Sequence, residues 1–260
     1  MAQTHSTEPL VYRPMSLPPR RKVGLDAPLR WLREGRRYFD RARGVSLLYG
    51  GVFAVAGIII TLLGVNQPQF ILTFWSGFLL VGPLLAIGLF RIAQLVDRGE
   101  SLRLMTCVGL LRKNLGAVAL FTLLLSLIMV AWIRFSTLAA ALYVGNLAGA
   151  NGFLGVLATP EGLGFLAVLF GVGAIFAVLL FALTAWSLPM VLDGRTDFGT
   201  AIVTSVRATF EQPLAMLAWG ATVAVLTILG MLTFFTGFAV IFPLLGYASW
   251  AAYKDIFGHA

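Results

Sequence analysis

Long uncharged apolar runs alternate with short polar segments along most of the chain. The runs cover residues 45–65, 70–90, 115–133, 162–188, 214–229 and 232–253. A helix of about 20 residues crosses the roughly 30 Å hydrocarbon core of a bilayer. The last two runs form one uncharged stretch, about twice the length that one span needs, so we expect it to fold back near Gly230 and Thr236–Gly237. The pattern predicts an all-α polytopic membrane protein whose six transmembrane helices form one domain, residues 45–257.

The polar segments predict short amphipathic helices between the hairpins of spans. Residues 28–44 place Leu29, Leu32 and Phe39 at near-helical spacing among arginines, which is typical of a juxtamembrane helix lying on lipid headgroups. Two later segments, beginning near Gly99 and Asp197, have a similar pattern. A surface helix followed by a hairpin of spans therefore occurs three times, as a weak parallel repeat. Residues 1–27, with several prolines among polar and basic residues, predict a disordered basic cytoplasmic tail.

Composition and charge agree with a membrane location. Hydrophobic residues make up 59% of the chain, charged residues 12%, and the mean hydropathy is +0.90, which excludes a water-soluble globule. The net charge is +8, and ten of the 19 Lys and Arg residues lie in the first 44 positions. Basic residues next to spans stay on the cytoplasmic side, so we expect both termini to be cytoplasmic, with only Arg134 of the basic residues outside. Five spans with an external carboxyl end stay open, because only Lys254 reports on that end. Membrane topology thus explains the positive charge, and we expect no nucleic-acid partner.

The basic surface segments are the candidate binding sites for anionic lipid headgroups, which attract Lys and Arg near the membrane surface. We expect headgroup contacts from Arg36, Arg37, Arg41, Arg43, Arg98, Arg103, Arg112, Lys113, Arg195 and Arg207. The ratio of 16 Arg to 3 Lys, with abundant Ala, Gly and Leu, suggests a bacterial chain. The expected location is therefore the bacterial cytoplasmic (inner) membrane, crossed several times.

Small residues and prolines mark two further features of the spans. Gly50, Gly57 and Gly64 recur every seven residues and form one smooth stripe on the first span. Such a stripe lets another helix approach closely, either within the bundle or in a homo-oligomer. Pro83 and Pro243 lie inside the second and sixth spans, where each removes a backbone hydrogen bond and bends the helix.

The predicted spans lack the side chains that catalysis, ion coupling and metal binding use. None of the six runs contains Asp, Glu, Lys, Arg, His, Asn or Gln, and the only histidines are His5 and His259 at the termini. We expect no catalytic residue, no metal and no cofactor, hence a protein that is not an enzyme. Two functions stay open. One is packing with partner membrane proteins, lipids or a second copy; the other is a permease or exporter of an apolar or lipid-like compound, with the bent spans lining its path.

Several short motifs in and after the spans resemble a known family of membrane proteins. They are Ser76-Gly77-Phe78 through Gly82-Pro83 to Gly88-Leu89-Phe90, Ser187-Leu188-Pro189 through Asp193 to Ala201, Thr204 to Ala208 with Pro213, and Pro243 to Gly246 with Trp250 and Tyr253. On these residues the chain, from about Trp31 onward, resembles the predicted integral membrane protein family known as domain of unknown function 2189. The resemblance implies a bacterial protein with six spans and assigns no reaction.

Overall fold

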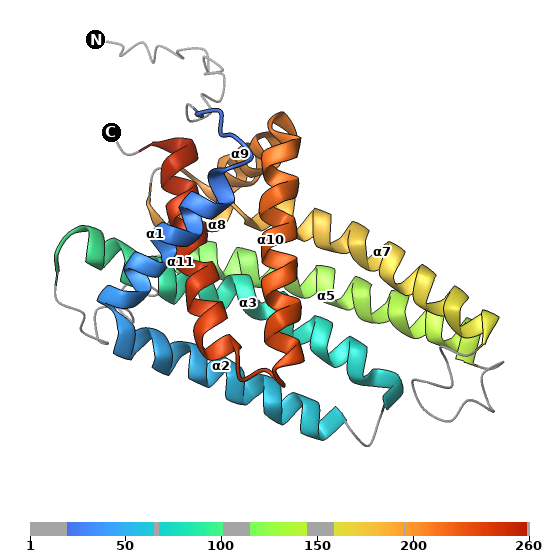
Figure 1. Ribbon diagram of the computed structural model, residues 1–260. Coiled ribbons are helices and arrows are strands. Elements are labelled where there is room, and N and C mark those ends of the chain that lie inside the picture. Colours follow the sequence, from blue (N-terminus) through green and yellow to red (C-terminus); the bar gives the residue numbers. More distant parts are fainter. Residues whose placement is uncertain (1–19, 65–67, 101–114, 145–158, 195, 259–260) are drawn as a thin grey trace, which may run out of the picture.

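The structure is a computed structural model of the chain, and it describes residues 20–64, 68–100, 115–144, 159–194 and 196–258. All regular secondary structure in these ranges is helical, which confirms the expected all-α class (Figure 1). In chain order the helices are α1 (Ala27–Arg41), α2 (Arg43–Gly64), α3 (Pro68–Asp97), α5 (Leu115–Val144), α7 (Pro160–Thr184), α8 (Ser187–Leu192), α9 (Phe198–Glu211), α10 (Pro213–Leu232) and α11 (Phe238–Phe257).

Five helical segments within the described ranges are long and apolar enough to cross a membrane. They are Arg43–Gly64, Gly77–Asp97, Val118–Tyr143, Pro160–Leu192 and Pro213–Leu232, and they match the first five predicted spans. Helix α11 occupies the place of the sixth but is not among these five. Its second half carries Tyr247, Trp250, Tyr253 and Lys254, which lower its hydropathy.

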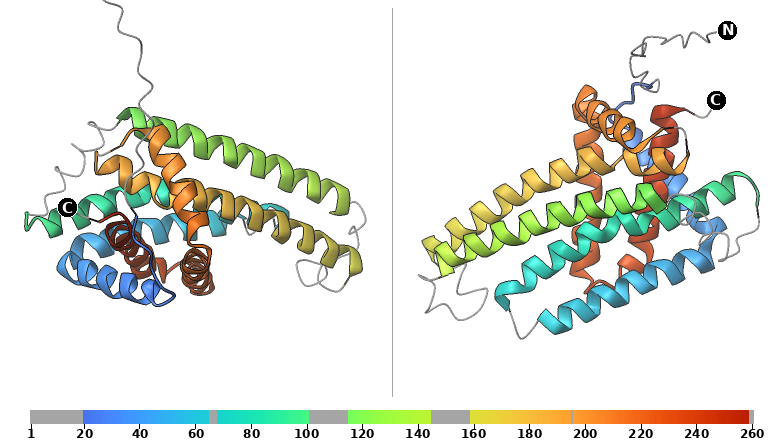
Figure 2. Two further views of the ribbon diagram at one scale, coloured as in Figure 1. Left: turned by 90° about the horizontal axis from the view of Figure 1, so that it is seen from above. Right: turned by 180° about the vertical axis from the view of Figure 1, so that it is seen from behind.

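Helix α11 is surrounded by other helices. It packs against α1, α2, α3 and α10, and more than half of its residues are buried (Figures 1 and 2). A helix sheathed by protein can carry polar side chains that a lipid-exposed helix could not, because neighbouring helices satisfy their hydrogen bonds. The packing of α11 against four other helices explains how it carries these polar side chains.

The contacts of α11 fix its direction relative to α2 and α3. Along α3, Phe78 meets Phe235, Leu89 meets Gly246 and Asp97 meets Lys254, and each pair is separated by 157 positions. Along α2 the order is reversed, because Ser46 meets Tyr247 and Gly57 meets Phe235. Helix α11 therefore points the same way as α3 and opposite to α2, and it crosses both helices at a steep angle (Figures 1 and 2).

Two helices extend further than the uncharged runs predict. Helix α3 continues through Arg91 to Asp97, and α5 continues through Arg134 to Val144. The expected ends at Phe90 and Ile133 were therefore wrong for the helices themselves. Arginine is a good helix former, and a charge marks where apolar surface ends without breaking the backbone hydrogen-bond pattern. The predicted surface helix after Gly99 and the polar loop after Val144 lie outside the described residues.

The turn between α10 and α11 forms without glycine at its tightest point. Phe234 and Phe235 have φ values of 51° and 65°, in the left-handed region that non-glycine residues rarely adopt. Phe235 is buried next to Gly57 and the ring of Phe78, while Phe234 is exposed. Burying the Phe235 ring offsets the backbone strain. The predicted turn residue Gly230 instead lies inside α10, where Phe238 packs against it.

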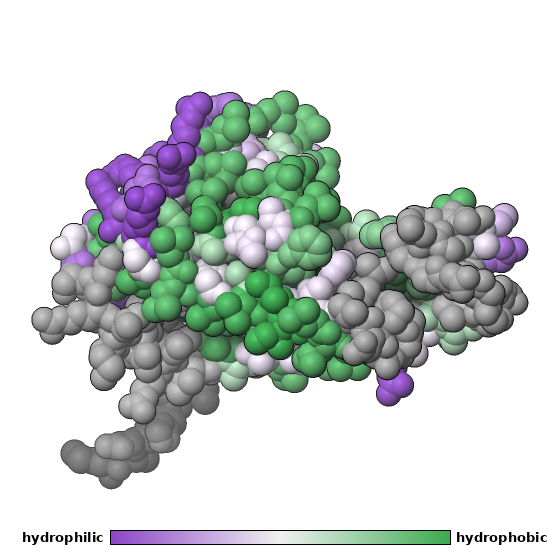
Figure 3. Space-filling model, turned by 60° about the horizontal axis from the view of Figure 1, so that its bottom comes forward, coloured by the Kyte–Doolittle hydropathy of each residue, from purple (hydrophilic) through white to green (hydrophobic). Residues whose placement is uncertain are grey.

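The outer surface of the helices is largely apolar. On α2, Val52, Ile59, Leu62 and Leu63 are all more than half exposed, and α5, α7 and α10 present similar side chains. Figure 3 shows a mostly hydrophobic face with hydrophilic residues gathered mainly at one end. A continuous exposed apolar surface of this extent indicates contact with lipid.

Candidate functional site

Polar side chains of the last three turns of α11 bind most of the neighbouring elements. Tyr247 bonds to Ser46 of α2, Trp250 and Lys254 bond to Asp97 of α3, Tyr253 bonds to Asp193 after α8, and Asp255 bonds to α1. We call this part of the structure, which contains the start of α2 and the ends of α3 and α11, the polar end. The polar end joins all three predicted repeat units through one helix.

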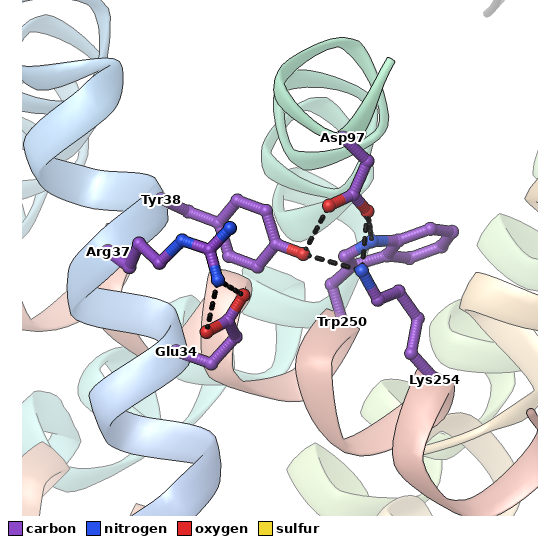
Figure 4. Close-up of polar contacts among 6 residues, drawn as sticks. All are labelled: Glu34, Arg37, Tyr38, Asp97, Trp250 and Lys254. Atoms are coloured by element: carbon purple, nitrogen blue, oxygen red, sulfur yellow. Dashed lines mark hydrogen bonds and ion pairs between the residues drawn. The ribbon is translucent and has the colours of Figure 1, made fainter. Parts of the chain in front are cut away.

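The centre of the polar end is a cluster of Tyr38, Asp97, Trp250 and Lys254 (Figure 4). The Tyr38 hydroxyl donates to Asp97 Oδ1 at 2.7 Å, and Lys254 Nζ donates to Asp97 Oδ2 at 2.8 Å. Trp250 Nε1 donates to the same Oδ2 at 3.2 Å, and Lys254 Nζ also donates to the Tyr38 hydroxyl at 2.8 Å. The Asp97 carboxylate thus accepts three hydrogen bonds and holds α1, α3 and α11 together.

The electrostatics of this cluster favour a structural role. Burial raises the pKa of the Tyr38 phenol well above its ordinary value, and the hydrogen bond to Asp97 raises it further. Tyr38 therefore stays protonated and acts as a donor. Lys254 Nζ donates to both the Asp97 carboxylate and the Tyr38 hydroxyl, so its hydrogen bonds are used in joining α11 to α3 and α1. The cluster is a clamp between helices rather than an acid–base pair.

The apolar face of α1 contacts protein. Trp31, Tyr38 and Phe39 are buried, and the Trp31 ring meets Trp219 of α10 edge to face at 5.4 Å between centroids. Trp31 Nε1 donates to Asp255 of α11 at 2.8 Å. The sequence assigned this face to lipid headgroups; in the structure α10 and α11 cover it instead. A stripe of apolar residues shows that one face of a helix is covered, without identifying what covers it.

The residues that precede α1 also bind the polar end. The Arg21 backbone N–H donates to the Ile256 carbonyl at 2.7 Å, and the Val23 N–H donates to Gln212 Oε1 at 2.7 Å. Gln212 Nε2 donates in turn to the Arg21 carbonyl at 3.0 Å. Residues 1–19 of the predicted tail lie outside the described residues, but residues 21–23 are fixed to α11 and to the start of α10.

The expected headgroup-binding arginines on α1 and at the start of α2 are exposed. Arg36 and Arg37 form ion pairs on their own helix with Asp40 and Glu34, whereas Arg41 and Arg43 have no ion pair with any described residue. Arg98 is exposed beside Glu100, and Arg207 is exposed on α9. The other expected residues, Arg103, Arg112, Lys113 and Arg195, lie outside the described part of the chain.

The structure places the glycine stripe against α11. A methyl group at Gly50 would lie 2.7 Å from the Ala239 carbonyl carbon and 2.8 Å from Pro243 Cγ, and one at Gly57 would overlap the Phe235 ring. Gly64 is buried at the end of α2. Pro243 is buried inside α11, and Pro83 is half-buried inside α3. The glycine stripe of α2 therefore fits against Ala239, Pro243 and Phe235 in and just before α11.

Sequence reasoning missed the polar cluster. Asp97 and Asp193 follow the second and fourth predicted spans and Lys254 follows the sixth, so each has an ordinary explanation as the polar boundary of a span. The shared signal was a carboxylate five to seven residues beyond the end of a predicted span, together with Trp, Tyr and Lys residues near the end of the chain. Among the described residues, no group of three or more His, Cys, Asp or Glu side chains is arranged to hold a metal ion.

Comparison with known families supports the membrane assignment. The family model described as Predicted integral membrane protein (DUF2189) matches residues 71–193, from α3 to the end of α8. The family is the one that the sequence motifs resemble; the motifs from Thr204 onward lie beyond the matched range. No curated protein and no solved structure matches the chain. The match and the five apolar helices identify an integral membrane protein.

Proposed function

We propose that this chain is a non-enzymatic protein of the bacterial cytoplasmic membrane that binds anionic lipid headgroups through the exposed arginines of α1 and packs with membrane partners. The single observation that supports it is the two-sided character of α1. One side is buried against α10 and α11, and the other carries exposed arginines at positions 33, 36, 37 and 41. A basic face held rigidly beside apolar helices is suited to a negatively charged surface.

The depth of α1 in the bundle fits this function. Gly35 of α1 packs against Leu244 and Ala248 of α11, and Ser46 in the first turns of α2 meets Tyr247 at the same level. Helix α1 therefore lies where the apolar part of α2 begins, which is the depth of the headgroups if α2 spans the bilayer. Each basic residue near an anionic surface contributes about 1 kcal/mol.

The lipid proposal predicts a loss of preference for anionic lipid when the basic face is neutralised. A variant with Arg33, Arg36, Arg37 and Arg41 replaced by Gln should lose most of the enrichment of phosphatidylglycerol over phosphatidylcholine in the lipid that copurifies with the protein in nanodiscs. Lipid composition by mass spectrometry measures this. Neutralising Arg134, exposed on α5 away from α1, is the matched control. Equal enrichment in the wild type and the quadruple variant would remove the basis of the proposal.

We further propose six spans with α11 as the sixth and both termini cytoplasmic. The supporting fact is that residues 235–254 contact α3 from Phe78 to Asp97, with a constant offset in sequence. If α3 crosses the membrane over this length, α11 crosses beside it, at an angle and shielded by protein. The α10–α11 turn then lies outside the cell, and α1 inside it.

Cysteine accessibility tests this topology. In a chain with Cys107 replaced by Ser, a cysteine at the exposed position Thr236 should react with a membrane-impermeant maleimide in intact cells. A cysteine at Arg33, exposed on α1, should react only after the membrane is permeabilised. Protection of Thr236→Cys in intact cells, with labelling after permeabilisation, would contradict the six-span arrangement.

The alternative function, a permease for an apolar compound, receives less support. It needs a path beside the bends at Pro83 and Pro243. The Pro243 ring is buried against Gly50, and Phe53 and Phe242 stack with 4.0 Å between ring centroids one turn away. These contacts fill the space between α2 and α11 where such a path would begin.

A further inference from the structure

Arg91 is a charged residue within the apolar part of α3. It is half-buried and lies in the segment Gly77–Asp97, which is long and apolar enough to span a membrane. No described carboxylate pairs with it, although seven other ion pairs are formed by described residues elsewhere. A charge inside a membrane segment is costly unless it meets a counter-charge, and such residues are usually functional.

The guanidinium of Arg91 is held in one orientation and is only partly used. Nη1 donates to Gln94 Oε1 at 3.1 Å, and Gln94 is itself buried one turn further along α3. The Nε–H is buried and has no acceptor among the described residues. A guanidinium has five N–H donors, and the edge formed by Nε and Nη2 is the one that can bind two oxygens of a phosphate or carboxylate. Gln94 takes neither of these two donors; because Nε is buried, a ligand would approach the guanidinium from the Nη2 side.

The register of the helices gives the depth of Arg91. Leu89 lies level with Gly246 of α11, and the next residue, Tyr247, lies level with Ser46 of α2. Arg91 is therefore near the level at which α2 begins, six residues or nearly two turns of helix before Asp97. If α2 and α3 span the bilayer, this is the level where phosphate groups meet the hydrocarbon core.

We propose that Arg91, oriented by Gln94, binds a phosphate group at the membrane surface, most directly the phosphate of a phospholipid in the adjacent leaflet. This site rests on the proposed membrane orientation, but it uses atoms separate from the basic face of α1. A phosphate would supply the missing negative charge and accept from Nη2, and a small turn of the guanidinium would bring the buried Nε–H to a second phosphate oxygen. Bidentate binding also requires arginine, because a lysine ammonium offers no planar pair of donors.

Native mass spectrometry of the delipidated protein in mild detergent, titrated with phosphatidylglycerol, tests this site. Arg91→Gln should weaken the tightest lipid-binding event by roughly tenfold or more, as expected when a charge-assisted hydrogen bond is lost. Arg91→Lys should recover only part of the affinity. Arg91→Gln removes a charge that has no partner in the described structure, so we expect it to fold, which thermal unfolding in the same detergent checks.

Two further measurements separate this proposal from the function of α1 and identify the source of the phosphate. The quadruple α1 variant should retain the tightest lipid while losing weaker anionic ones, and Arg91→Gln should do the reverse. Inorganic phosphate that displaces the lipid in the wild type would assign the site to free phosphate, and no displacement would assign it to lipid. Equal first-lipid affinity in the wild type, Arg91→Gln and Arg134→Gln would overturn the proposal.

Discussion

Replacing Gly50 with alanine should destabilise the protein by about 2–3 kcal/mol, at the upper end of the usual cost of overpacking a core. The added methyl group meets the Ala239 carbonyl carbon at 2.7 Å and Pro243 Cγ at 2.8 Å. A flexible side chain could move away, but backbone of α11 and a proline ring cannot. Helix α11 would have to shift away from α2, which also disturbs the contact of Gly57 with Phe235. Unfolding in mixed micelles of mild detergent and sodium dodecyl sulfate measures the free energy.

The neighbouring glycine provides the matched control. A methyl group at Gly51 meets nothing within 4 Å, so Gly51→Ala should be neutral or stabilising by up to about 1 kcal/mol through its helix propensity. The two substitutions are chemically identical and adjacent, but only Gly50→Ala should lower the free energy of unfolding. If Gly50→Ala is as stable as Gly51→Ala, α2 and α11 do not approach each other as the structure has them.

The sequence predicted the apolar helices well because hydropathy depends mainly on local composition. Long uncharged runs located α2, α3, α5, α7 and α10. The packing of α11 against four other helices could not be predicted from local composition. Its Trp, Tyr and Lys residues lower its hydropathy, and they are tolerated because other helices surround it. That information lies in the packing of distant segments and not in any one window of sequence.

The polar end was harder to predict because its partners lie far apart in the chain. Tyr38 is separated from Asp97 by 59 positions, and Asp97 from Lys254 by 157. Each residue alone has an ordinary explanation as the boundary of a span. Only the packing of α11 against α3 brings the Asp97 carboxylate and the Lys254 ammonium together. The glycine stripe shows the same limit, since its spacing indicated close packing but could not distinguish α11 from a second copy of the chain.

Breaking the ion pair between Asp97 and Lys254 should destabilise the protein by about 2 kcal/mol for either single substitution, Asp97→Asn or Lys254→Met. Their side chains are 30% and 23% exposed, so the cost should fall between the 3–5 kcal/mol of a buried pair and the 0–1 kcal/mol of a surface pair. Either change leaves the other charge without its counter-ion, next to donors or acceptors that remain in place.

A double-mutant cycle separates this pairwise energy from other effects of the substitutions. The double variant Asp97→Asn with Lys254→Met should be less destabilised than the sum of the singles, with a coupling of about 1–2 kcal/mol, since it leaves no unpaired charge. The exposed pair of Arg98 and Glu100 lies directly after Asp97, with 3.9 Å between Arg98 Nη1 and Glu100 Oε1. It serves as the control and should show a coupling near zero. If both cycles gave the same small coupling, solvent would be screening Asp97 and Lys254 as fully as a surface pair. The clamp would then not be what holds α3 to α11, and their contact would have to depend on apolar pairs such as Phe78–Phe235, Leu89–Gly246 and Phe90–Trp250.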